Sequence, residues 1–189
     1  MKKRKKSSPA RRTLKLRRRI ALIGFRGCGK SVTGQELARL YGTVCISLDQ
    51  YIEEKEQKSI TQITELNGWQ YFRERELSAL QELSTREDLF ILDTGGGVVE
   101  NADGTISQEK IDILRKYYFC IYLAMNDEAL LARLDAINRS KSRPALPQGN
   151  EAALLRRKPM YAKAAHAVVD VTNTRKHEAA TRIVSLLGD

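Results

Sequence analysis

The residues from Gly24 to Ser31 have the types and spacing needed to bind a nucleotide. They read Gly-Phe-Arg-Gly-Cys-Gly-Lys-Ser and match the phosphate-loop pattern G-x-x-x-x-G-K-[S/T]. Glycines let backbone N–H groups wrap around a polyphosphate, and Lys30 would place a positive charge near the β- and γ-phosphates. The Ser31 hydroxyl can bind Mg²⁺. The sequence therefore predicts a phosphate-binding loop at this point of the chain.

Two acidic residues follow the next two apolar runs. Asp49 comes after residues 43–46, where a carboxylate would face the ligand crevice and could accept a proton from a phosphoryl acceptor. Asp is also favoured as a helix N-cap, and the two roles are compatible. Asp93 ends the run 90–92, like a Mg²⁺-associated carboxylate of the Walker B kind. The glycines Gly95–Gly97 then allow the backbone to approach a ligand closely.

Three basic stretches could serve phosphate chemistry. The segment 138–150 carries Arg143 and two prolines, and it could be a lid that closes over a bound nucleotide or an ordinary surface loop. Arg73, considered alone, reads as a surface ion pair with neighbouring glutamates. The stretch Arg156–Lys158, considered alone, reads as a solvated helix face. Beside a phosphate loop, we favour the lid interpretation for residues 138–150.

The elements that would position these residues alternate between strand and helix. This alternation predicts an α/β fold of three layers, with a five-stranded parallel sheet, helices on both faces and a mobile lid. A capping-box spacing at Ser59 and Gln62 and a stop signal at Gly68 mark helix boundaries. The predicted strands are 20–23, 43–46, 90–92, 120–123 and 168–171; the predicted helices are 31–41, 49–56, 59–67, 69–83, 108–116, 127–137, 151–164 and 177–187.

Composition points to a single soluble domain in a reducing compartment. The chain has 189 residues, 42% hydrophobic and 30% charged, and no apolar run approaches the length of about 20 residues that a membrane span needs. Its three cysteines, Cys28, Cys45 and Cys120, form no disulfide or zinc pattern. We therefore expect a cytoplasmic protein with no membrane partner. Nothing in the pattern signals an interface, so we expect a monomer.

The net charge of +10 lies in the first residues. Residues 1–19 contain 11 Lys or Arg and no Asp or Glu, whereas the rest of the chain has 22 basic and 23 acidic residues. We predict that residues 1–18 form a basic disordered tail and that residues 19–189 form a single folded domain containing the phosphate loop. The tail could make weak contacts with nucleic acid or an anionic surface. The alternative of a solvated tail is favoured on composition, and a short organellar leader is the least favoured.

Taken together, the motifs resemble the shikimate kinase family over about residues 19–189. The order of the phosphate loop, Asp49, Arg73, the triple glycine, Arg143-Pro144 and Arg157 carries the resemblance. It implies the substrates shikimate and ATP, with Mg²⁺ as cofactor. It further implies that Asp49 orients or deprotonates the 3-hydroxyl, that Arg73 and Arg157 bind the shikimate carboxylate, and that Gly95, Gly96 and Gly97 contact shikimate. For ATP it implies Gly27, Cys28, Gly29, Lys30, Ser31 and Val32 at the phosphates, Arg133 at adenine and Arg143 from the lid.

One position departs from the family pattern. The family usually has Asp-x-Asp after the second strand, and here the first of these positions is Ser47. A serine hydroxyl carries no charge to offset Mg²⁺. We therefore hypothesise that Asp93, on the neighbouring strand, supplies the missing carboxylate, and that Ser31 and Asp93 form the metal site.

The sequence leaves one further residue role and three functional alternatives open. Cys28 lies near Lys30 and a helix N-terminus, which favours a lowered thiol pKa and inactivation by thiol reagents, unless the side chain only fills the loop. A related small-molecule kinase, such as a gluconate kinase, is the nearest rival to shikimate kinase. A non-catalytic shikimate-kinase-like module of a regulator is another. Nucleic-acid binding through the tail is the third.

Overall fold

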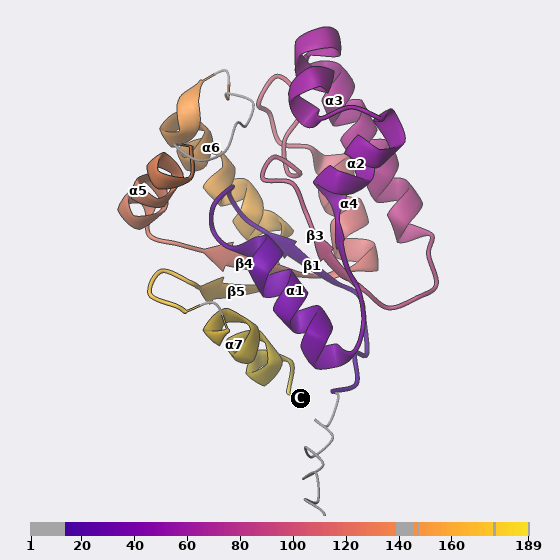
Figure 1. Cartoon of the computed structure of the whole chain (residues 1–189), viewed down its shortest axis with the longest axis vertical. Helices are drawn as coiled ribbons and strands as arrows, with labels where there is room; N and C mark the ends of the chain where they lie inside the picture. Colours follow the sequence, from indigo (N-terminus) through magenta and orange to yellow (C-terminus); the bar gives the residue numbers. More distant parts are fainter. Residues whose placement is uncertain (1–13, 139–145, 147, 176, 189) are drawn as a thin grey trace, which may run out of the picture.

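A five-stranded parallel sheet forms the centre of the computed structural model, which describes residues 14–138, 146, 148–175 and 177–188 (Figure 1). The strands lie in the order β2-β3-β1-β4-β5, so β1 lies in the middle. Ile20, Ala21, Leu22 and Ile23 of β1 are fully buried, as expected for a strand covered on both faces. The bounds are β1 Ile20–Ile23, β2 Cys45–Ser47, β3 Ile91–Asp93, β4 Phe119–Ala124 and β5 Ala167–Asp170.

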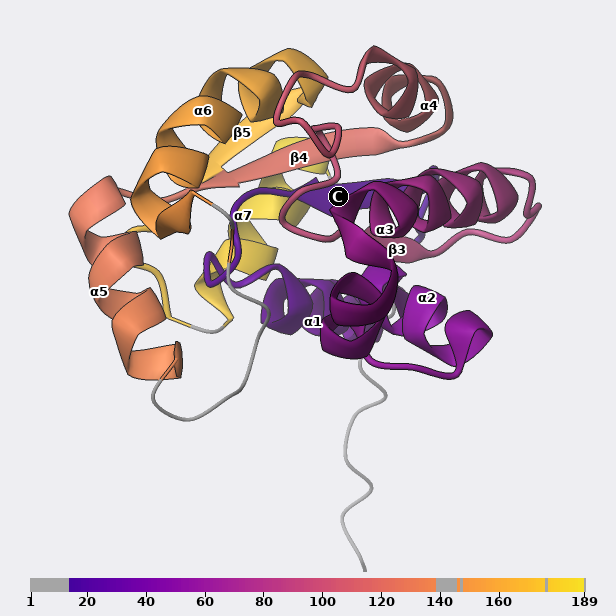
Figure 2. The same ribbon diagram turned by 90° about the horizontal axis from the view of Figure 1, so that it is seen from above.

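Helices cover both faces of this sheet (Figure 2). Helices α1 and α7 pack together on one face, and α4 and α6 pack together on the other. Helix α2 packs on α3 beside the β2 edge, and α5 contacts α6. The bounds are α1 Lys30–Tyr41, α2 Leu48–Glu56, α3 Ile60–Ser84, α4 Gln108–Tyr117, α5 Asp127–Asn138, α6 Gly149–Ala164 and α7 Glu178–Leu187.

The predicted three-layer α/β architecture is confirmed, with one local difference. The second strand begins at Cys45, two residues later than predicted. The helix stop predicted at Gly68 is confirmed, because Gly68 adopts the non-helical φ 80° and ψ 170° and divides α3 into two helical segments that meet at a kink. The capping box at Ser59 and Gln62 is present, with reciprocal hydrogen bonds.

The last residues of the predicted tail lie against the domain. The backbone N–H of Leu14 donates to the carbonyl of Leu40 at 3.1 Å, and Leu16 is buried in the core. Arg19 donates to the carbonyls of Ser84 and Arg86 at 2.9 and 3.0 Å. Residues 1–13, which hold most of the predicted tail, lie outside the described residues.

No helix within the described part of the chain is both long enough and apolar enough to cross a bilayer.

Candidate active site

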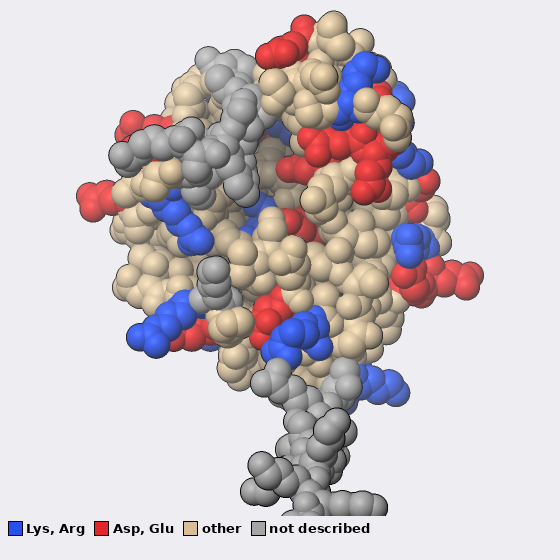
Figure 3. All heavy atoms as spheres, viewed as in Figure 1, with Lys and Arg blue, Asp and Glu red and all other residues tan. Residues whose placement is uncertain are grey.

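A cavity of about 520 Å³ opens where the C-terminal ends of the strands meet. The loops that follow β1 and β3, together with the end of β2 and the start of α2, supply its floor, and residues of α3, α5 and α6 supply its walls. This is where a parallel α/β sheet binds its ligands. Figure 3 shows a hollow in this face of the molecule, with both basic and acidic side chains in its depth. The cavity therefore has the position and the polarity of an active site.

The loop between β1 and α1 has the conformation of a phosphate cradle. Gly29 is the N-cap of α1 and adopts φ 103°, a left-handed conformation that favours glycine. The positive end of α1 thus faces the cavity. The Lys30 ammonium donates to the carbonyls of Gly24 and Phe25 at 2.9 and 3.2 Å, so the lysine holds the loop closed from within. Ser31, Val32 and Gly27 also line the cavity.

Of the two roles left open for Cys28, the structure supports the loop filler and not a thiol with a lowered pKa. Its side chain is buried in the core, and it does not line the cavity. Burial raises the pKa of the Cys28 thiol, and this outweighs the lowering effect of Lys30. The sequence shows the positive charge of Lys30 near the thiol, but it does not show that the thiol is buried away from solvent. The thiol is therefore a packing group of the loop, and rapid inactivation by thiol reagents at this position is not expected.

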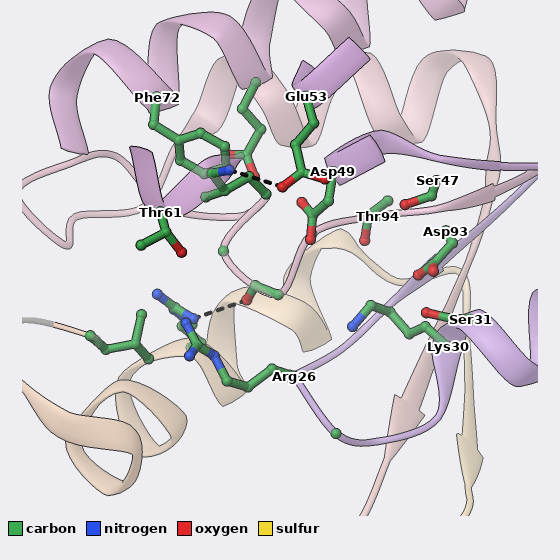
Figure 4. Close-up of a pocket in the computed structure, with 18 of the residues that line it drawn as sticks. Arg26, Lys30, Ser31, Ser47, Asp49, Glu53, Thr61, Phe72, Asp93 and Thr94 are labelled. Atoms are coloured by element: carbon green, nitrogen blue, oxygen red, sulfur yellow. Dashed lines mark hydrogen bonds between the residues drawn. The ribbon is translucent and has the colours of Figure 1, made fainter. Parts of the chain in front are cut away.

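Asp49 points into the cavity from the first turn of α2 (Figure 4). Its helix is capped by Ser47, whose hydroxyl accepts from the backbone N–H of Gln50 at 3.3 Å. The capping role suggested for Asp49 therefore belongs to Ser47, and the Asp49 carboxylate remains available to the cavity. Burial, followed by the charge of Glu76, raises the pKa of Asp49 from 3.8 to about 6. Such a carboxylate is ionised at neutral pH and suits a general base.

The triple glycine makes room for the charged groups around it. A Cβ on Gly95 would lie 2.5 Å from Oδ1 of Asp49, and a Cβ on Gly96 would lie 2.9 Å from the backbone nitrogen of Arg26. A Cβ on Gly97 would collide with the guanidinium of Arg73. None of the three has a positive φ, so close approach explains these glycines rather than backbone conformation.

Arg73 and Arg157 come together from α3 and α6, although 84 positions separate them in the chain. Both are buried, and both line the cavity. Arg73 donates to Glu76 at 2.9 Å and to Glu100 at 3.1 Å. Arg157 donates to the carbonyl of Gly96 at 3.1 Å and makes a short ion pair with Glu100. The ion pair suggested for Arg73 with a neighbouring glutamate is therefore present, to Glu76, but it is buried and does not lie at the surface.

A buried lysine and a half-buried arginine complete a network around this arginine pair. Lys110 of α4 donates to Glu76 and to the Glu100 carbonyl, both at 2.7 Å. Arg156 reaches the other oxygen of Glu100 at 3.1 Å. We call this group the arginine–carboxylate network. Its members are Arg73, Arg156, Arg157, Lys110, Glu76 and Glu100. It holds four cations and two carboxylates, an excess of two positive charges that suits an anionic ligand.

Oxygen groups suitable for a hard cation lie on the other side of the cavity. Figure 4 shows Asp93 beside Ser31 and Lys30, with Ser47 nearby. Asp93 and Ser47 are register partners on β3 and β2, so their side chains leave the sheet edge side by side. Carboxylate and hydroxyl oxygens are typical Mg²⁺ or outer-shell partners. Among the described residues there is no cluster of three or more His, Cys, Asp or Glu that could hold a metal by itself.

The cavity brings together most of the residues that the sequence singled out. Arg143 lies outside the described residues, and Cys28 is the one described candidate whose side chain faces away. The candidates lining the cavity are Gly27, Gly29, Lys30, Ser31, Val32, Asp49, Arg73, Asp93, Gly95, Gly96, Gly97, Arg133 and Arg157. Their individual roles remain predictions.

Sequence reasoning found only part of the network around the arginine pair. Glu76 was considered as a surface partner of Arg73, whereas Glu100 and Lys110 were not identified. Lys110 carried a usable signal, because it lies on the same helix face as the core residues Ile111 and Leu114. A lysine in that position must be paired with an anion if it is buried. Arg26, another lining residue, gave no signal beyond its place in the phosphate loop.

Comparison with known proteins gives one consistent family. A family model described as shikimate kinase matches residues 26–188. A shikimate kinase from Leptospira biflexa is 35% identical over 176 residues, covering 89% of this chain and 95% of the relative. A solved structure of Acinetobacter baumannii shikimate kinase in complex with shikimate has a TM-score of 0.79 and 30% identity, covering 90% of this chain and 92% of that chain.

A more distant structure shares the fold alone. A gluconokinase from Sinorhizobium meliloti has a TM-score of 0.54 and 16% identity, and it covers 93% of this chain and 94% of that chain. Its TM-score and identity are both lower than those of the Acinetobacter baumannii shikimate kinase.

Proposed function

The chain belongs to the shikimate kinase family, and we propose that its cavity transfers the terminal phosphate of ATP to the 3-hydroxyl of shikimate. One observation carries the proposal at the level of the site. The phosphate loop, the Asp49 carboxylate and the arginine pair open into the same cavity. For this reaction a protein must supply a binding site for the phosphate donor, a proton acceptor and an anchor for the substrate carboxylate.

The residues divide the reaction between two sides of the cavity. The backbone of Gly27–Val32, with Lys30, would hold the ATP phosphates, and Arg133 would lie against adenine. Across the cavity, Arg73 and Arg157 would hold the shikimate carboxylate, because guanidinium groups match the geometry of a carboxylate. Asp49 would then face the 3-hydroxyl and accept its proton as the oxygen attacks the γ-phosphorus. ADP is the leaving group.

We propose Mg²⁺ as the cofactor, with Ser31 as a ligand and Asp93 as a partner in the outer shell. Mg²⁺ would neutralise charge on the ATP phosphates. The position of Asp93 beside Ser31 and opposite Ser47 supports this assignment. The Ser47 hydroxyl caps α2 by accepting from Gln50, and it carries no charge. Of the two neighbours Ser47 and Asp93, only Asp93 therefore offers a carboxylate for Mg²⁺.

We also propose that the protein is a cytoplasmic monomer. The absence of a membrane-spanning helix among the described elements is consistent with a cytoplasmic enzyme. We propose a monomer, since one chain supplies both sides of the cavity. The basic first residues could add weak contacts with nucleic acid.

The deciding experiment measures ADP release by the full chain with MgATP, with and without shikimate, and with gluconate as the comparison. We expect release that depends on shikimate, with phosphate transferred to shikimate. Turnover with gluconate alone would contradict the role of the arginine pair. Binding of ATP and shikimate without ADP release would favour the non-catalytic regulatory module. Ser47→Asp, which introduces the residue of the family pattern, would then be the first variant to test.

A further inference from the structure

Glu100 contacts both arginines of the pair. It follows the triple glycine by three positions and has an exposed fraction of 3%. Its Oε1 accepts from Nη2 of Arg73 at 3.1 Å and also from Nη2 of Arg157, while its Oε2 accepts from Nη2 of Arg156 at 3.1 Å. A single carboxylate therefore connects α3 to α6 through three guanidinium groups.

The backbone around Glu100 is held as firmly as its side chain. Its N–H donates to the carbonyl of Gly97 at 3.1 Å, and its carbonyl accepts from Lys110 at 2.7 Å. It pairs with Ile106 in an isolated antiparallel bridge, and Ser107 donates to Val99 at 2.9 Å to close the loop. The carboxylate is thus a fixed point against which the two arginines are placed.

Glu100 contacts the arginine pair from the side away from the main cavity. Arg73 and Arg157 line the main cavity, and Glu100 does not. Glu100 lines a second, smaller cavity of about 40 Å³, together with Arg156 and the same two arginines. The pair therefore separates two spaces, with the substrate cavity in front and Glu100 behind.

The arginine pair keeps spare donors beside an ionised Glu100. Burial alone would raise the pKa of Glu100, but the Arg157 hydrogen bond and the surrounding positive charges lower it, so it remains ionised at neutral pH. The Nη atoms of Arg73 and Arg157 each donate to Glu76, Glu100 or the Gly96 carbonyl, whereas their buried Nε atoms have no hydrogen-bond partner within the described part of the structure. The pair is therefore held in place and still has unused donors.

We propose that Glu100 is a positioning residue that sets the affinity for the carboxylate of the substrate. It fixes the separation and orientation of the two guanidinium groups before the substrate arrives, so that binding loses less side-chain entropy. Because Glu100 acts only through the arginines, it should affect recognition of the carboxylate and leave ATP binding and the chemical step largely intact. This inference rests on the proposed function of the arginine pair.

The test compares shikimate with its methyl ester, which keeps the ring and hydroxyls and lacks the negative charge. In Glu100→Gln we expect KM for shikimate to rise roughly tenfold, the size expected when one hydrogen bond to a charged group is lost or misplaced. KM for the ester, the affinity for ATP and kcat should change less than about twofold. The preference for shikimate over the ester should therefore fall about tenfold.

The sign of the change separates positioning from simple charge compensation. Removing a negative charge beside the pair should by itself strengthen attraction for an anion. A lower KM for shikimate in Glu100→Gln would show that Glu100 competes with the substrate, and it would overturn the proposal. Equal losses with shikimate and ester would also overturn it, because they would indicate a general structural defect.

Two further variants keep the test decisive. Arg156→Gln removes the third contact of Glu100, together with an exposed hydrogen bond to Gln148, at a half-buried side chain outside the main cavity. It should raise KM for shikimate about two- to fivefold, and it serves as the test if Glu100→Gln does not fold. Glu109→Gln, the same chemical change on the exposed start of α4, should leave every constant unchanged. Wild-type turnover with shikimate is measured first, so failure of the proposed function is recognised separately from failure of this inference.

Discussion

At the scale of single residues, the buried carboxylate of Asp49 suits a general base but lowers the stability of the folded protein. The carboxylate lies beside Gly95, close to the buried Glu76, and one oxygen of Glu76 has no hydrogen-bond partner among the described residues. Two carboxylates near each other are costly to ionise. The pKa of Glu76 stays low, although burial opposes this, because Arg73 and Lys110 compensate its charge. For Asp49, burial and the charge of Glu76 outweigh the lowering effects of Lys30 and Arg73, and its pKa rises to about 6.

Replacing Asp49 by Asn should therefore remove activity and stabilise the fold. We expect kcat to fall by at least about a hundredfold, because the proton acceptor is lost, with little change in ATP affinity. At pH 7.5 the free energy of unfolding should rise by about 1 to 3 kcal/mol, since a pKa raised from 3.8 to about 6 costs up to about 3 kcal/mol when the group is ionised. Denaturant unfolding of both proteins measures this.

The control for this prediction is pH. Because the folded pKa of Asp49 lies above its unfolded value, the cost is present above about pH 6 and disappears as the pH falls toward 3.8. The stability difference between wild type and Asp49→Asn should shrink over the same interval. A difference that stays constant with pH would show that the Asn effect comes from packing.

The pH dependence of turnover should report the same group. Asp49 accepts a proton only when ionised, so kcat/KM for shikimate should fall as the pH drops through about 6, by up to tenfold for each further unit. Glu76 and Glu100 have lowered pKa values and remain ionised over this range. A profile that is flat down to pH 5, measured where the protein is still folded, would contradict the role of Asp49 as the base.

At the scale of elements, two neighbouring strands decide where the metal-associated carboxylate lies. β2 and β3 run parallel and pair Ser47 with Asp93, so a carboxylate at either strand end reaches the same region. This register explains how Asp93 could replace the Asp that the family pattern places at position 47. Positions 47 and 93 are neighbours at the end of the sheet, although they are 46 residues apart in sequence.

Asp93→Asn should weaken the dependence of ATP binding on Mg²⁺, and Ser47→Asp should restore it. We expect the Mg²⁺ concentration for half-maximal enhancement of ATP binding to rise about tenfold in Asp93→Asn, the usual scale for an outer-shell partner. Adding Ser47→Asp to that variant should recover most of the loss. Titration calorimetry of ATP at varied Mg²⁺ measures the effect without turnover. Asp103→Asn, in an exposed loop, is the control, and an Asp93 variant that behaves like it would contradict the assignment.

The elements also explain which parts of the site could be predicted from the sequence. The phosphate loop follows β1, Asp93 ends β3 and Asp49 lies two residues after β2, so local pattern was enough to locate them. Glu100 and Lys110 were not found, because their roles depend on side chains that arrive from other elements, as far as 57 positions away. The same limit applies to Cys28, whose burial depends on packing that its own motif does not describe. Gly68 was recognised as a helix stop, and the structure has non-helical backbone there, with two helical segments of α3 meeting at a kink.

At the scale of the whole molecule, the basic N-terminal residues divide into two parts. Leu14, Leu16 and Arg19 contact the domain, whereas residues 1–13 hold seven Lys or Arg and little apolar content. The globular part is close to neutral, so any attraction for polyanions must come from the excess positive charge of residues 1–19. The two parts should therefore respond differently to truncation.

Deletion of residues 1–13 should change charge-dependent binding and nothing else. We expect kcat and the thermal midpoint to stay the same, while the affinity of the full chain for a DNA oligonucleotide, which should fall steeply with salt, is largely lost. Deletion of residues 1–19 should in addition lower the free energy of unfolding by about 1 to 3 kcal/mol, because it removes the buried Leu16 and the Arg19 hydrogen bonds. Fluorescence anisotropy at two salt concentrations and denaturant unfolding separate the two effects. Salt-independent binding, or equal binding by the full chain and the shorter deletion, would contradict a nucleic-acid role for the tail.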